Sequence, residues 1–268
     1  MQANDIDLGA ADAPLRYWRD DGIAHIRFNR PTVLNAIDIP TANGFLAACQ
    51  AAWQDKDVRV VVISGEGRAF IAGGDLAAMR ADPLPTARAL IDAMHGGIAL
   101  LAQMNAPVLA SLHGAVAGGG LGVALAADLA IAAEGTRFNL AYVNIGTSSD
   151  CCTSWALPRL VGMRKAMEIA LLGDTFDAAE ALRLGIVNRV VPAASLQEET
   201  QRLARRLADG PPLALARLKR LIRDSLGRDL QGQLDAEAES FAACAATRDF
   251  GEGVNAFFEK RPARYVGE

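Results

Sequence analysis

The amino-acid sequence predicts an α/β fold that ends in a helical region. Strand-like and helix-like segments alternate from about residue 15 to residue 133, which is typical of α/β proteins. Beyond Asp150, almost every periodic segment has helical spacing. The sequence contains no internal repeat and no long linker. We therefore expect one domain, with a core of residues 1–192 and a helical C-terminal region of residues 193–268.

The first elements are two strands, a helix and a third strand. Residues 15–19 and 23–28 alternate apolar and polar side chains on either side of Asp20-Asp21-Gly22. Alternation around an Asp-Gly pair predicts a β-hairpin. A helix is expected after Pro40, where apolar side chains recur every three or four residues, and Val60–Ile63 reads as a buried strand.

The alternation then continues toward the middle of the chain. Leu90–Met104 has helical periodicity and Pro107–Leu112 is a short apolar strand. Gly118–Ala127 is predicted as an alanine-rich helix that leads to a strand over Leu129–Ala133. In the last third only Ile186–Val191 is strand-like. The helices expected there are Met163–Leu172, Ala178–Leu184, Ala194–Asp209, Leu213–Leu226, Leu230–Ala246 and Phe250–Glu259.

Composition and charge exclude several classes of function. The formal net charge of -4 offers no basic field for nucleic acid or an anionic membrane. The most apolar stretch, Gly118–Ala133, is interrupted by Asp128 and is shorter than the ~20 residues of a membrane span. The N-terminal segment lacks the features of a signal or transit peptide, so we expect a cytoplasmic protein. Four cysteines without a CxxC pair predict reduced thiols and neither a disulfide framework nor a metal site.

Two segments, Arg59–Leu76 and Ala106–Ala130, share one order: an apolar strand, a glycine-rich turn and the start of a helix. Glycine allows a ligand to approach the backbone, and N–H groups at a helix N-terminus favour negative charge. Two such turns could hold one oxygen in an oxyanion hole, where each donor contributes on the order of 3 kcal/mol. The alternative is that the glycines only permit tight turns. The spacing does not match the dinucleotide-binding pattern.

Several ordered motifs closely resemble the crotonase (enoyl-CoA hydratase/isomerase) superfamily. The resemblance extends from about Leu15 to Arg261. The motifs are Asn29-Arg30-Pro31 with Leu34-Asn35-Ala36, Ala69 to Leu76 (AFIAGGDL), His113-Gly114 leading to Gly118-Gly119-Gly120, Leu157 to Gly162 (LPRLVG), Ala178 to Asn188 (AAEALRLGIVN) and Glu252 to Arg261 (EGVNAFFEKR).

The resemblance implies a spiral of ββα units whose C-terminal helices build a homotrimer or a dimer of trimers. It also implies an acyl-CoA thioester substrate, with coenzyme A as part of that substrate and no other cofactor. The backbone N–H groups of Gly74 and Gly119 would bind the thioester oxygen and stabilise an enolate. By the same resemblance, the substrate-binding residues would be Val33, Leu34, Ala36, Ala72, Asp75 and, from a neighbouring subunit, Lys260.

The sequence departs from the family's hydratases at the two glutamates that activate water, because the matching positions are Gly122 and Tyr142. The remaining carboxylate is Asp150, just before a helical stretch, where the residue alone suggests an N-cap. The resemblance favours catalysis, since Asp150 matches an aspartate of dienoyl-CoA isomerases, a ring-epoxide isomerase and 4-chlorobenzoyl-CoA dehalogenase. Tyr142 would line the pocket or bond to the substrate.

We therefore expect double-bond isomerisation with Asp150 as the single base. A second interpretation makes Asp150 the nucleophile and His95 the base of a dehalogenase or thioester hydrolase, because His95 matches the histidine of the dehalogenase. An atypical hydratase and a non-catalytic member that only binds a CoA thioester are further alternatives.

Overall fold

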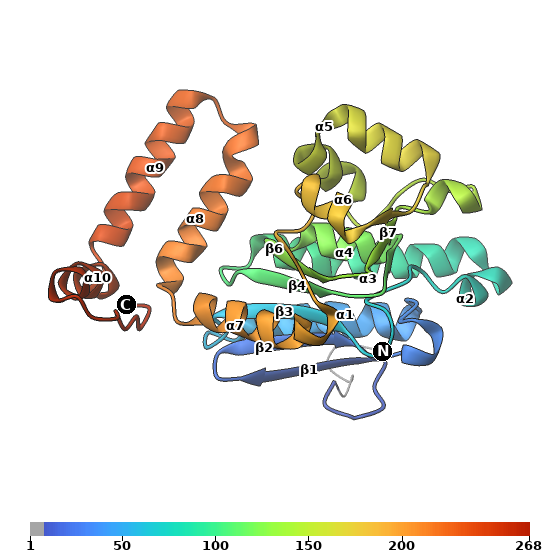
Figure 1. The fold of residues 1–268 in the computed structure, drawn as a ribbon, viewed down its shortest axis with the longest axis horizontal. Helices are drawn as coiled ribbons and strands as arrows, with labels where there is room; N and C mark the ends of the chain where they lie inside the picture. Colours follow the sequence, from blue (N-terminus) through green and yellow to red (C-terminus); the bar gives the residue numbers. More distant parts are fainter. Residues whose placement is uncertain (1–7) are drawn as a thin grey trace.

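The computed structural model describes residues 8–268, and a sheet of six strands forms its centre (Figure 1). The strand order is β1-β2-β3-β4-β6-β9. The first two strands form the expected antiparallel hairpin, and the remaining pairs are parallel. The strands are β1 (Leu15–Asp20), β2 (Ile23–Phe28), β3 (Val60–Gly65), β4 (Val108–Leu112), β6 (Leu129–Ala133) and β9 (Arg189–Val191).

Three short strands form a second sheet in the order β5-β7-β8. These strands are β5 (Ala115–Ala117), β7 (Arg137–Asn139) and β8 (Phe176–Asp177). Sequence periodicity did not predict them, because a strand of two or three residues is too short to show alternation. The α/β fold with a helical C-terminal region is confirmed.

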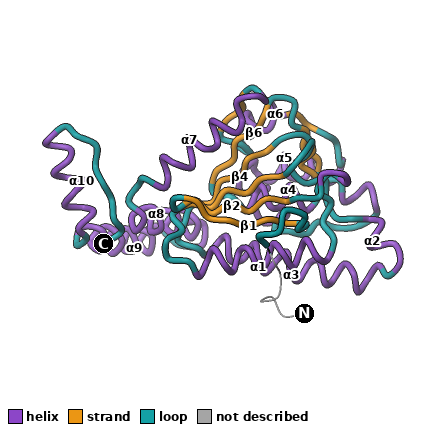
Figure 2. The backbone as a smooth tube through the Cα atoms, turned by 90° about the horizontal axis from the view of Figure 1, so that it is seen from below, coloured by secondary structure: helices purple, strands orange, loops and turns teal. Residues whose placement is uncertain are grey.

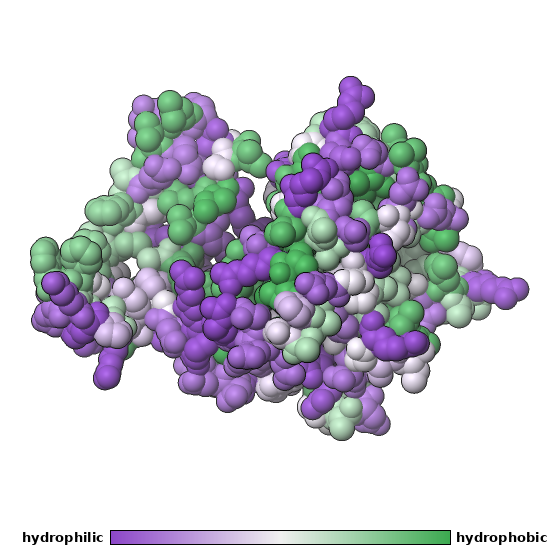
Figure 3. Space-filling model, viewed as in Figure 1, coloured by the Kyte–Doolittle hydropathy of each residue, from purple (hydrophilic) through white to green (hydrophobic). Residues whose placement is uncertain are grey.

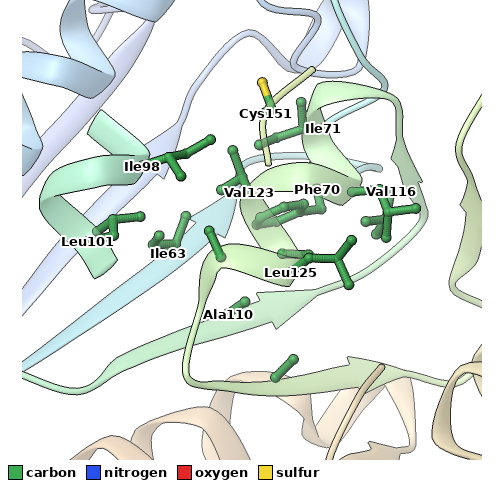
Figure 4. Packing of buried hydrophobic residues seen from close by; sticks show 14 of the residues in the cluster. Ile63, Phe70, Ile71, Ile98, Leu101, Ala110, Val116, Val123, Leu125 and Cys151 are labelled. Carbon is green, nitrogen blue, oxygen red and sulfur yellow. The ribbon is translucent and has the colours of Figure 1, made fainter. Parts of the chain in front are cut away.

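Helices cover both faces of the main sheet (Figure 2). On one face, α1 (Ile39–Gln54), α3 (Pro83–Gln103) and α4 (Gly119–Ala126) contribute to the larger hydrophobic cluster. Side chains from several elements, among them Ile63, Phe70 and Val123, pack together in this cluster (Figure 4). On the other face, α7 (Leu196–Ala208) packs its apolar side chains against the sheet. Burial on both faces explains why the parallel strands are continuously apolar.

The C-terminal helices α8 (Pro212–Asp224), α9 (Leu230–Ala245) and α10 (Arg248–Glu259) project from this body as an arm (Figure 1). The other helices are α2 (Leu76–Ala81), α5 (Thr153–Leu172) and α6 (Ala178–Arg183), with short 3-10 turns η2 (Pro31–Val33), η3 (Tyr142–Ile145), η4 (Ala193–Ser195) and η5 (Ser225–Gly227). Of the helices described, none is long and apolar enough to cross a membrane.

Three element predictions need correction. Helix α3 begins at Pro83 and not at Leu90, since Pro occupies its first turn. The segment α5 is broken at Gly162, whose φ of 76° and ψ of 158° are not helical, so the predicted helix Met163–Leu172 forms its second part. The part from Thr153 to the break was not predicted. The predicted strand Ile186–Val191 pairs only from Arg189, because its first residues form a buried turn on α6.

Candidate active site

The two glycine-rich turns predicted from the sequence lie against each other. A Cβ atom on Gly118 would stand 3.5 Å from the Cα of Gly73, within van der Waals contact, and both residues have a positive φ that favours glycine. Backbone hydrogen bonds join the same segments, with Ala117 N–H donating to Ile71 O at 2.9 Å and Ile71 N–H donating to Ala115 O at 3.2 Å. The turns follow the carboxyl ends of the neighbouring parallel strands β3 and β4.

The N–H groups of Gly74 and Gly119 are free to bind a ligand. Within residues 8–268, neither group donates a hydrogen bond. Gly119 is the first residue of α4, where an N–H has no acceptor in its own helix. Both residues line one cavity of about 260 Å³. The geometry therefore supplies two backbone donors at one cavity, as an oxyanion hole requires.

The rest of this cavity is mostly apolar. Its apolar wall comes from α2 and α3 through Leu76, Met79, Leu90, Ile91 and Met94. Sequence analysis did not identify these lining residues. The signal that could have found those on α3 is its amphipathic pattern, but periodicity alone cannot separate a core-facing side chain from a cavity-facing one.

Asp150 and Tyr142 meet at the cavity. The Tyr142 hydroxyl donates a hydrogen bond to Asp150 Oδ1, and this oxygen lies 3.9 Å from where a Cβ atom on Gly119 would stand. The pKa of Tyr142 is raised well above its usual value, mainly by burial and secondly by the nearby Asp150 carboxylate. The phenol therefore keeps its proton. The structure thus brings three of the predicted catalytic residues together.

The interpretation of Asp150 as an N-cap is wrong. Helix α5 begins after Cys152, and no side chain caps it. Asp150 contacts the helix only through its backbone carbonyl, which accepts from Thr153 N–H at 3.1 Å and from Thr153 Oγ1 at 2.8 Å. Its carboxylate points instead to Tyr142. Of the described residues that line the cavity, Asp150 is the only carboxylate.

The position matching a hydratase glutamate has no room for a side chain. A Cβ atom on Gly122 would lie 2.3 Å from Cys151 O and 2.5 Å from Cys151 Cβ. Cys151 itself is buried, and burial raises the pKa of its thiol. Cys151 therefore occupies the space that the side chain of a glutamate at position 122 would need.

His95 lies on α3 beside Cys151 but does not line the cavity. Its Nε2 accepts a hydrogen bond from Cys151 N–H at 3.1 Å. The other two histidines lie elsewhere: His113 Nε2 bonds to Gly67 O, and His25 stacks on Trp18 in the hairpin.

Among the residues expected to contact coenzyme A, only Ala72 lines the cavity. Its N–H donates to Leu34 O at 3.1 Å, which places the segment containing Val33, Leu34 and Ala36 directly beside it. Lys260 follows α10 in the C-terminal arm and does not reach the cavity of its own chain.

Asp75 does not line the cavity either. Its carboxylate caps α2 by accepting from Ala77 and Ala78 N–H at 3.1 Å, and it pairs with Arg30 at 3.1 Å. Burial alone would raise the pKa of Asp75, but the Ala78 N–H and Arg30 outweigh it and the pKa is lowered. This carboxylate therefore serves to hold α2 beside the cavity.

Across residues 8–268, no group of three or more His, Cys, Asp or Glu side chains is arranged to hold a metal ion.

Comparison with known proteins identifies close relatives along nearly the whole chain. A family model described as enoyl-CoA hydratase/isomerase matches residues 19–268. The chain is 36% identical over 253 residues to a protein of Rhodobacter capsulatus named "Probable enoyl-CoA hydratase", covering 94% of this chain and 98% of that one. It is 33% identical to the 1,2-epoxyphenylacetyl-CoA isomerase of Escherichia coli, over 93% of this chain and 97% of the relative.

The fold is also similar to a solved structure. The crystal structure of an enoyl-CoA hydratase from Bacillus anthracis superimposes with a TM-score of 0.91 and 28% identity, covering 95% of this chain and all of the other. The spiral α/β fold that the motifs imply is thereby confirmed.

Proposed function

Because this chain belongs to the enoyl-CoA hydratase/isomerase family, we propose that it moves a double bond in an acyl-CoA thioester with Asp150 as its single acid–base group. The observation that carries this proposal is the cavity itself. Among the described residues that line it there is one carboxylate, which lies next to Gly119, and the N–H groups of Gly119 and Gly74 are both unused. One carboxylate is enough for isomerisation, whereas the family's hydratases position water with two.

The first step would remove a proton from the carbon next to the thioester. The thioester oxygen accepts hydrogen bonds from Gly74 and Gly119 N–H, and the electron pair left by the proton spreads onto this oxygen as an enolate. Each donor stabilises that charge by on the order of 3 kcal/mol. Asp150 takes the proton and becomes neutral.

The second step would return the same proton to the γ-carbon. The electron pair of the enolate flows back through the conjugated system, and the double bond moves from the β,γ position to the α,β position. Asp150 is again a carboxylate, so no net proton or electron is gained or lost. The Tyr142 hydroxyl, which keeps its proton, orients the carboxylate throughout.

The apolar wall of the cavity would exclude water from the enolate. Coenzyme A enters this proposal only as part of the substrate, beside Ala72 and the segment from Val33 to Ala36. No separate cofactor takes part.

The test is the conversion of a 3-enoyl-CoA into the conjugated 2-enoyl-CoA, followed by the absorbance of the conjugated thioester. We expect the wild type to convert it and Asp150→Asn to be slower by on the order of a thousandfold. Asn has the same shape, so thioester binding should persist in the variant. A wild type that binds the thioester without converting it would refute isomerisation.

Hydration is the less favoured reaction because both glutamate positions are lost. Gly122 has no room for a side chain, and the Tyr142 hydroxyl keeps its proton and donates a hydrogen bond to Asp150, so it cannot accept a proton from water. Release of a 3-hydroxyacyl-CoA from a 2-enoyl-CoA in the same assay would show that water is activated in another way. Binding without any turnover would support a non-catalytic role.

A second candidate function uses Asp150 as a nucleophile. It is favoured by one observation: His95 contacts the residue that follows Asp150. In a dehalogenase, the Asp150 carboxylate would form an ester and release a halide ion; in a thioester hydrolase, it would form an anhydride and release the coenzyme A thiolate. His95 would have to release the Cys151 N–H from its Nε2 before it could activate the water that cleaves this intermediate. Oxygen from heavy-isotope water would then appear in Asp150 after a single turnover, and its absence would exclude this mechanism.

A further inference from the structure

The peptide group that joins Asp150 to Cys151 is held at both ends. Its carbonyl oxygen accepts from the N–H and the hydroxyl of Thr153, at 3.1 and 2.8 Å. Its N–H donates to His95 Nε2 at 3.1 Å. A peptide group is planar, so fixing both its oxygen and its N–H fixes the direction in which the chain leaves Asp150.

The surroundings of this peptide leave it little freedom. Cys151 has a φ of 48° in the left-handed region, which is costly for a residue with a side chain and needs support from its neighbours. On one side its backbone packs against Gly122, where an added Cβ would stand 2.3 Å from Cys151 O. On the other side stands His95.

His95 is itself on a firmly packed element. Helix α3 lies so close to α1 that a Cβ atom on Gly97 would be 2.5 Å from the Phe45 ring. The imidazole therefore extends from a fixed backbone, although its own side chain is exposed. An acceptor on a rigid helix is suited to hold the strained peptide in place.

The hydrogen bond also determines what His95 can do chemically. An Nε2 atom that accepts from Cys151 N–H has no lone pair left for a proton, so the neutral ring carries its hydrogen on Nδ1. A general base for water would need this lone pair free and directed into the cavity, and His95 does not line the cavity.

We propose that His95 is a positioning residue, which holds the Asp150–Cys151 peptide through its Nε2 and so sets the Asp150 carboxylate beside Gly119. This inference rests on the proposed role of Asp150 as the proton-transferring group. Tyr142 fixes the carboxylate itself, and His95 with Thr153 fixes the backbone that carries it. Small displacements of a reacting group are expensive, since about 1 Å can cost on the order of a hundredfold in rate.

The first test compares His95→Gln with His95→Ala. The glutamine amide oxygen can accept the same Cys151 N–H but cannot act as a base, and alanine can do neither. We expect His95→Ala to lower kcat by roughly ten- to a hundredfold with little change in KM. His95→Gln should stay within about threefold of the wild type, because it keeps the acceptor.

His113→Gln is the matched control, since His113 bonds to Gly67 O and does not line the cavity, and it should leave kcat unchanged. If His95→Gln is as slow as His95→Ala, the imidazole acts as a base and the proposal fails. If His95→Ala equals the wild type, the hydrogen bond has no role in turnover and the proposal also fails.

A second measurement does not depend on activity. NMR of protein with nitrogen-labelled histidine reports which ring nitrogen carries the hydrogen, and the His95 signals are assigned by their loss in His95→Gln. We expect the Nδ1–H form with Nε2 accepting, and an Nε2–H form would overturn the proposal. If the wild type turns over a CoA thioester in another way, the same ranking of variants applies to that reaction. A wild type without isomerase activity would therefore refute the proposed function. The role of His95 would still be tested by the ranking of the variants and by the NMR measurement.

Discussion

Gly122 shows how a residue without a side chain can decide which chemistry is available. The position of one hydratase glutamate is Gly122 here, and the Cys151 backbone occupies the space next to it. A side chain at this position would therefore have no room. Cys151 takes this place because it adopts a left-handed conformation that lays its carbonyl on α4. The missing carboxylate and the position of Asp150 are therefore two results of one local conformation.

Filling this contact should destabilise the protein. Gly122→Ala would force a Cβ atom against the Cys151 carbonyl oxygen, and overpacking against backbone should cost roughly 3 kcal/mol of unfolding free energy. Urea unfolding followed by circular dichroism would measure the loss.

Gly251→Ala is the matched control, because this helical glycine has nothing within 4 Å of an added Cβ. It should be neutral or more stable by up to about 1 kcal/mol, as alanine favours helices. Equal effects of the two substitutions would contradict the packing argument. A Gly122→Glu substitution should not produce hydratase activity, because the side chain has no room at this position.

At the scale of elements, the two glycine-rich turns lie at one edge of the sheet because they follow the parallel, neighbouring strands β3 and β4. Helix α2 then follows Gly74 directly and contributes Leu76 and Met79 to the cavity wall. With only six residues, α2 depends on its cap and on the ion pair between Asp75 and Arg30 to stay in place.

Removing the charge of Asp75 tests that dependence. Asp75→Asn keeps an N-cap but loses the ion pair with Arg30, so we expect a loss of about 1 kcal/mol at neutral pH. The pKa of Asp75 is lowered in the folded protein, so its contribution is present above the unfolded aspartate pKa of about 3.9. That contribution disappears as the pH falls through the folded pKa.

The measurement is the difference in unfolding free energy between the wild type and Asp75→Asn, at neutral pH and below about pH 3.9. The difference should shrink with acid. A difference that stayed constant would show that Asp75 acts by shape and not by charge. Asp75→Ala should lose roughly 1 kcal/mol more at neutral pH, because alanine cannot cap the helix.

At the scale of the whole molecule, the C-terminal arm is tied to the body by charges and presents apolar side chains outward. Lys219 is nearly buried and pairs with Asp128 at 2.8 Å, while Arg223 bonds to the same carboxylate. Apolar surface gathers over the arm in Figure 3. The most exposed large apolar side chains there are Phe257 (78%), Phe258 (77%), Leu230 (76%), Leu226 (71%) and Phe241 (69%).

Such a surface predicts self-association. We expect the protein to sediment as a homotrimer or a dimer of trimers, the assembly that the sequence motifs imply. Substituting Phe257 and Phe258 with aspartate should shift the distribution toward monomer in analytical ultracentrifugation. A wild type that is monomeric at all concentrations would contradict this prediction.

Local signals made most of the fold predictable. The Asp20-Asp21-Gly22 turn predicted the hairpin, and periodicity located the long helices to within a few residues, apart from the starts of α3 and α5. The short strands of the second sheet were missed, because each has too few residues to show a period. Of helix α2 only the start was expected, at the end of the segment Arg59–Leu76. In the site, glycine patterning indicated the two turns, and the resemblance to the family singled out Gly74, Gly119 and Asp150.

The sequence by itself determined the α/β fold and the family, since these follow from periodicity and from ordered motifs, and it proposed candidates for the site. Only the tertiary structure decided what those residues contact. It turned Asp150 away from a capping role and toward Tyr142, used Asp75 to cap α2, and directed the His95 lone pair to the Cys151 N–H. The physical reason is that a hydrogen-bond partner depends on which distant backbones are packed together, and one-dimensional spacing does not contain that information.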